Sequence, residues 1–132
     1  MNKLEAKITQ IQQSGAILLV DAEVDGQVFS ALLIESATNP EWLQIGHSVN
    51  LVFKETEVSL AKNLAGTISI RNKMVCTVIS INKGELLSKI EMKFNNYTIG
   101  SLITTRAVNA LELIVNEEII AMVKSNEISL MC

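Results

Sequence analysis

The chain has 132 residues, of which 48% are hydrophobic, 4% aromatic and 19% charged, with one proline and six glycines. This composition excludes a disordered or fibrous chain, and a net charge of −3 at pH 7 argues against a general nucleic-acid binder, which usually carries a basic face. No apolar run approaches the roughly 20 residues of a membrane span, and no apolar signal segment opens the sequence. We therefore expect a soluble, cytoplasmic protein without membrane insertion.

Apolar residues at alternate positions predict the first clear pair of strands. Residues 20–24 alternate in this way, Asp25-Gly26 is suited to the positive φ angles of a tight hairpin turn, and residues 29–33 resume the alternation. Asn39-Pro40 then predicts the start of a short helix, which Gly46 would end. These signals are typical of a β-hairpin followed by one helical turn or two.

Two further strands follow the expected helix. Val49, Leu51 and Phe53 form another alternating strand, and a short final strand carries Val58 and Leu60. Five strands and one helix within about 60 residues are typical of an OB-type barrel.

The same elements recur 70 residues later, with no gap in the alignment. Identical residues include the pairs Asn2/Asn72, Ile11/Ile81, Leu32/Leu102, Lys54/Lys124, Glu57/Glu127 and Leu60/Leu130. We predict an all-β fold of two tandem OB-like five-stranded barrels, each with one short helix, at residues 1–62 and 63–132. One copy of about 60 residues buries too little surface alone, so we expect the copies to pack intimately and the chains to form an oligomer.

Few residues are available for catalysis or metal binding. His47 is the only histidine, and Cys76 and Cys132 have neither metal-ligand spacing nor the density of a disulfide framework. We therefore expect no enzyme activity and no metal bound directly by side chains.

The second copy is the better host for an anion. Residues 1–62 carry four Lys and Arg against eight Asp and Glu (net −4), whereas residues 63–132 carry seven against six (net +1). Because the first and fourth strands of such a barrel commonly pair, Arg71 and Lys124 are expected at one place. The hydroxyls of Ser69 and Ser125, with backbone N–H groups, would complete a pocket for a tetrahedral dianion.

Three segments carry a resemblance to a known family. Ser69-Ile70-Arg71-Asn72 resembles the Ser-Ala-Arg-Asn signature of molybdate-binding Mop domains (molbindins, TOBE-type). Residues 103–111 resemble their Val-Thr-x-x-Ser-Val-x-x-Leu segment, and residues 121–125 resemble their Ala-Leu-Ile-Lys-Ala/Ser strand. The resemblance covers nearly the whole chain as two tandem modules.

The resemblance implies molybdate or tungstate as the ligand, no organic cofactor, and assembly as a homo-oligomer, commonly a trimer of two-module chains. Carried over by position, the oxyanion-binding residues are Ser69, Ile70, Arg71, Lys124 and Ser125, with Ile70 and Ser125 contributing main-chain amides; Thr104 would come from a neighbouring module. The implied function is storage, buffering or homeostasis of the oxyanion. The alternative is an oxyanion-sensing regulatory or interaction module that acts in trans on a transporter or regulator.

The sequence departs from this pattern mainly in its first copy. Met1 stands at the position of Arg71, Ile34 at that of Thr104, and Glu55 at that of Ser125, where an anion needs a donor. We expect the first module to be mainly structural. Two alternatives also remain open for the second copy, since Lys124 could pair with Glu127 and Thr104 could serve only as a strand-end residue.

Overall fold

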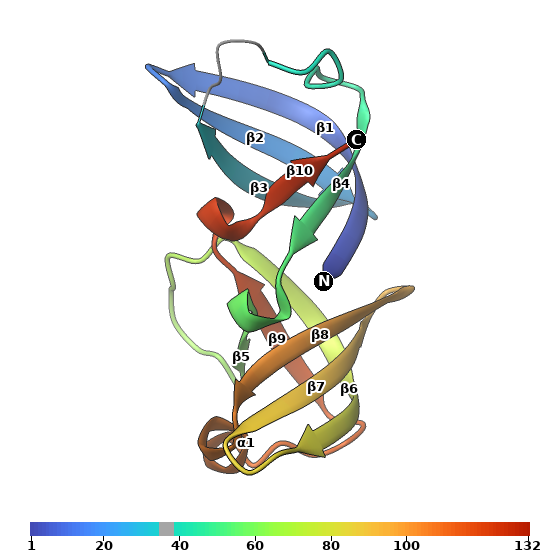
Figure 1. Ribbon diagram of the computed structural model, residues 1–132, viewed down its shortest axis with the longest axis vertical. Coiled ribbons are helices and arrows are strands. Elements are labelled where there is room, and N and C mark those ends of the chain that lie inside the picture. Colours follow the sequence, from blue (N-terminus) through green and yellow to red (C-terminus); the bar gives the residue numbers. More distant parts are fainter. Residues whose placement is uncertain (35–38) are drawn as a thin grey trace.

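Two curled antiparallel sheets lie one above the other along the long axis of the molecule (Figure 1). The protein is represented by a computed structural model that describes residues 1–34 and 39–132. The first sheet contains β1 (Asn2–Ser14), β2 (Ile17–Val24), β3 (Gln27–Ile34) and β4 (Ser48–Phe53), and the second contains β6 (Asn72–Lys83), β7 (Leu87–Phe94), β8 (Tyr97–Thr104) and β9 (Glu118–Val123). Corresponding strands begin 70 residues apart, in agreement with the sequence repeat.

The fifth strand of each sheet comes from the other half of the sequence. β5 (Ser59–Ala61) pairs with β9, so that Leu60 lies opposite Ala121, and β10 (Ser129–Met131) pairs with β4, so that Leu130 lies opposite Leu51. Five strands per sheet were predicted, but this exchange was not. The boundary expected between residues 62 and 63 therefore divides the sequence copies and not the hydrogen-bonded sheets.

A short helix forms in the second half only, within the described residues. α1 (Thr105–Leu111) begins after Thr104, whose Oγ1 accepts a hydrogen bond from the backbone N–H of Ala107 at 3.1 Å. The helix predicted from Asn39-Pro40 is wrong, because turns occupy residues 41–46. Pro40 corresponds to Ala110 in the last turn of α1, where a proline ring would clash with the preceding turn.

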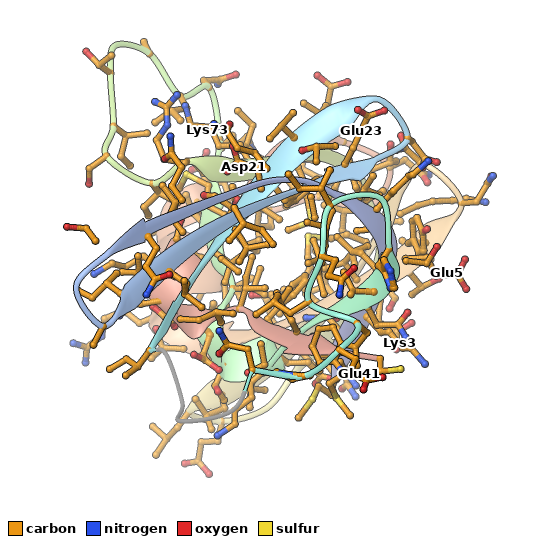
Figure 2. The ribbon with its side chains drawn as sticks, turned by 90° about the horizontal axis from the view of Figure 1, so that it is seen from above. Lys3, Glu5, Asp21, Glu23, Glu41 and Lys73 are labelled. Carbon is orange, nitrogen blue, oxygen red and sulfur yellow. The ribbon has the colours of Figure 1, made fainter. Side chains whose placement is uncertain are left out.

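One hydrophobic core runs through both sheets. The alternating residues Val20, Ala22 and Val24 are each 1% exposed, and Phe29 and Phe94, from different halves, meet edge to face with ring centroids 6.1 Å apart. Figure 2, which looks along the long axis, shows charged side chains such as Glu5 and Glu23 at the outside of the first sheet. No helix in residues 1–34 and 39–132 is long and apolar enough to cross a membrane.

Two buried asparagines join the halves in the same way. The side chain of Asn72 accepts from the backbone N–H of Ser30 at 2.8 Å and donates to its carbonyl at 2.9 Å. Asn2 makes the equivalent pair of hydrogen bonds with Gly100, at 2.7 and 2.9 Å. Because positions 2 and 72, and 30 and 100, correspond in the repeat, the contact is pseudo-symmetric.

Candidate functional site

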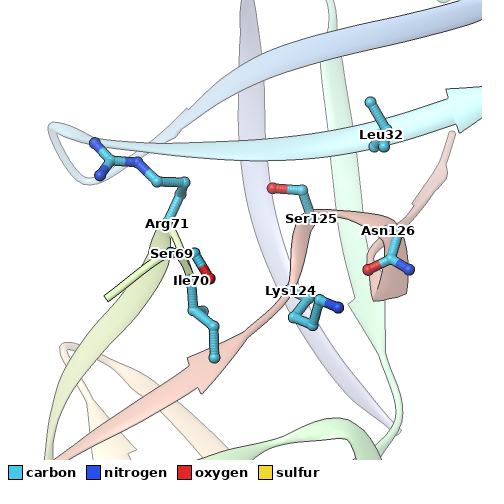
Figure 3. A pocket seen from close by; sticks show the side chains of 7 residues that line it. All are labelled: Leu32, Ser69, Ile70, Arg71, Lys124, Ser125 and Asn126. Carbon is cyan, nitrogen blue, oxygen red and sulfur yellow. The ribbon is translucent and has the colours of Figure 1, made fainter. Parts of the chain in front are cut away.

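The strand register brings two separate basic segments to one place. β6 and β9 are antiparallel, with Asn72 opposite Val123, so the residues before β6 lie beside those after β9. They surround an open pocket of about 360 Å³ (Figure 3). The pocket is lined by Leu32, Ser69, Ile70, Arg71, Lys124, Ser125 and Asn126. Five of the six predicted ligand residues therefore lie together, and their role as ligands remains a prediction.

The polar side chains approach this pocket from different directions. In Figure 3 the Ser125 hydroxyl points to the side of Arg71, whereas Lys124 extends to the side of Asn126. Arg71 and Lys124 are both exposed, so their long side chains are free to reorient. The pocket thus offers two exposed cations and one hydroxyl that is already hydrogen-bonded.

Ser30 of β3 holds the Ser125 hydroxyl. The two Oγ atoms are 2.7 Å apart, and the backbone of Ser30 is fixed by Asn72. Leu32, two residues further along β3, forms an apolar part of the pocket wall. The first half of the chain therefore contributes to a pocket whose charged residues all come from the second half.

Sequence reasoning missed Ser30, Leu32 and Asn126. Asn126 directly follows the Lys-Ser pair and could have been included on that ground. Ser30 and Leu32 could not, because β3 reaches the pocket only through the packing of one sheet on the other.

Lys124 also acts on a nearby pair of carboxyl groups. Burial and the adjacent carboxyl of Glu57 raise the pKa of Glu127, while the positive charge of Lys124 acts in the opposite direction. Lys124 nevertheless forms no salt bridge within the described part of the chain. Its ammonium group remains available to an anion in the pocket.

Thr104 lies away from this pocket. It caps α1 and lines a second pocket with residues that include Leu87, Arg106 and Asn109. A single chain therefore does not bring Thr104 to Arg71, and a contribution from a neighbouring chain remains a prediction.

No group of three or more His, Cys, Asp or Glu residues that could hold a metal ion occurs in residues 1–34 and 39–132. Cys76 is 1% exposed, and burial raises the pKa of its thiol to about 12. Its thiol is therefore protonated at neutral pH and behaves as a small apolar core group.

Comparisons with known proteins define the class of domain first. Residues 68–130 match the TOBE domain family, and these residues include the whole candidate pocket except Leu32. The part of the chain that carries Arg71 and Lys124 is thus similar to TOBE domains.

Individual relatives agree with this class. The chain has the fold of a crystal structure of the cytoplasmic molybdate-binding protein ModG with molybdate bound, with a TM-score of 0.91 and 22% identity over 98% of this chain and 94% of that one. It is also 33% identical, over 78 residues, to the molybdenum import ATP-binding protein ModC of Brucella abortus and of Brucella suis. The match covers 58% of this chain but only 22% of those curated relatives.

Proposed function

We propose that this protein binds molybdate or tungstate in the cytoplasm, without catalysing a reaction, and serves in storage or buffering of the oxyanion. The observation that carries the proposal is the pocket where Ser69, Arg71, Lys124 and Ser125 meet. Two cations can balance a dianion, and hydroxyl and amide donors can satisfy its oxygens. The TOBE-type match and the fold shared with ModG support the same ligand.

We further propose that another chain completes this pocket. The pocket of about 360 Å³ is open to solvent in a single chain, so its lining residues alone do not enclose a bound anion. A neighbouring chain that supplied Thr104 would close the opening, in line with a trimer of tandem Mop modules at residues 1–62 and 63–132. Pocket size and donor placement would then discriminate against the smaller sulfate.

Arg71→Ala is expected to weaken molybdate binding by about 10-fold to 150-fold, because charge-assisted hydrogen bonds contribute about 1.5–3 kcal/mol. Isothermal titration of the wild type and the variant, with sulfate as competitor, measures this loss. Lys93→Ala is the control, since Lys93 is an exposed cation of the second half that lines neither this pocket nor the one at Thr104. Absence of binding to the wild type, or equal affinity in both variants, would contradict the proposed site.

Ser30→Ala is expected to reduce molybdate affinity by about 2-fold to 12-fold, because the Ser30 hydroxyl orients that of Ser125 through a hydrogen bond contributing about 0.5–1.5 kcal/mol. The same substitution should have no effect when Ser125 is already alanine. Titration of the two single variants and the double variant closes this double-mutant cycle. Independent, additive losses would show that Ser30 does not act through Ser125.

A second candidate function is oxyanion sensing in trans. The matched relatives are import ATP-binding proteins in which the aligned region is about a fifth of the length, so a domain of this kind is found attached to a transporter component. Association with such a partner that depends on molybdate would support this function. If the association does not depend on molybdate, storage is the supported function.

A further inference from the structure

The first half of the chain contains a position equivalent to the oxyanion pocket, built on the same frame. Asn2 holds the backbone of Gly100 through the same pair of hydrogen bonds by which Asn72 holds Ser30. The lysine that borders the pocket, Lys124, is matched by the exposed Lys54. The two positions therefore share the asparagine contact and the lysine.

Two linked differences distinguish the first-half position. Glu55 stands where the pocket has Ser125, and Gly100 stands where it has Ser30. A side chain at position 100 would begin 3.2 Å from the Cγ and Cδ atoms of Glu55. The larger acidic side chain fits because the buried residue opposite it has no side chain.

The carboxylate of Glu55 already has cationic partners. Its Oε2 lies 3.4 Å from the ammonium group of Lys89, and its Oε1 lies 3.3 Å from the amino group of Met1. Burial acts to raise the pKa of Glu55, but these two contacts outweigh it and lower that pKa below its ordinary value. A carboxylate with two cationic partners therefore stands at the position where the equivalent pocket has a hydroxyl donor, Ser125.

We infer that Glu55 is a built-in substitute for the bound oxyanion, so that the chain carries one such site where its repeat provides the frame for two. This inference rests on the proposed function of the Arg71 pocket. The internal carboxylate neutralises Lys89 and repels a second dianion, which leaves the two halves with different roles.

Glu55→Ser tests the inference by restoring the residue type found at position 125. Equilibrium dialysis with molybdate, followed by elemental analysis, counts the anions bound per chain. The count should rise from one to two, and the new site should be about 10-fold to 150-fold weaker, because Met1 stands where the pocket has Arg71. Adding Lys89→Ala to Glu55→Ser should abolish the new site and leave the original one unchanged.

Glu41→Ser is the matched control, since it removes one exposed acidic residue from the same half without touching this position. If the wild type binds one anion and Glu55→Ser also binds one, the inference is overturned while the proposed function stands. If Glu41→Ser gains the same second site, the site arises from the reduced negative charge of the first half and not from the loss of Glu55. The inference is then also overturned. If the wild type binds none but Glu55→Ser binds one that depends on Lys89, the proposed function fails and the role of Glu55 is supported.

Discussion

Phe29→Ala is expected to lower the free energy of unfolding by about 3–5 kcal/mol, the usual cost of removing a buried phenylalanine ring. Phe29 is 1% exposed, and its ring packs edge to face on Phe94 of the other half. The substitution should therefore destabilise both sheets together, although it lies in only one of them. Urea denaturation followed by circular dichroism and by the fluorescence of Trp42, the single tryptophan, measures both effects.

The neighbouring Val28 provides the control for this experiment. Its side chain is 53% exposed, so Val28→Ala should change stability by no more than about 0.5 kcal/mol. If Phe29→Ala produced two separate transitions, with the second half unaffected, the two sheets would not share one cooperative core.

Asn72→Ala is expected to lower the free energy of unfolding by about 2–6 kcal/mol. The side chain is fully buried, and its loss would leave the N–H and the carbonyl of Ser30 without their partner, at about 1–3 kcal/mol for each unsatisfied group. Thermal and urea unfolding of the variant measure the loss. The affinity for molybdate should fall as well, because Ser30 would no longer be held against Ser125.

Asn82→Ala provides the comparison, since Asn82 is an exposed asparagine on the same strand. It should retain both wild-type stability and wild-type affinity. A small effect of Asn72→Ala on stability would mean that water replaces the lost hydrogen bonds, and that the asparagine does not hold the halves together.

The strands and most of their partners could be predicted from local patterns. Alternation of apolar residues located β2 and β7, and Asp25 and Gly26, with φ angles of 51° and 85°, form the turn that their residue types favour. The pairing of first and fourth strands also follows a regular topology, which is why the sequence alone predicts that Arg71 and Lys124 lie close together.

The exchange of β5 and β10 could not be predicted in this way. Leu60 and Leu130 occupy equivalent positions, and the strands they face, β4 and β9, carry the same apolar pattern. Either short strand therefore suits either sheet locally, and the choice depends on the path of the chain through the 3-10 turns at Glu55–Glu57 and Ser125–Glu127. The helix in the first half was predicted wrongly for a related reason, because Asn39-Pro40 carries a start signal at a position where the equivalent helix is about to end.

The strand exchange also has a consequence for how the protein is made. During synthesis β4 emerges early, but its outer neighbour, β10, is separated from it by the 75 residues between Phe53 and Ser129. At about 5–20 residues per second the ribosome needs roughly 4–15 s to produce that strand. For this time the N-terminal sheet has an open edge of unpaired N–H and carbonyl groups, which is a template for pairing with another nascent chain. Polysomes that carry closely spaced copies are therefore where this fold is most exposed to misassembly.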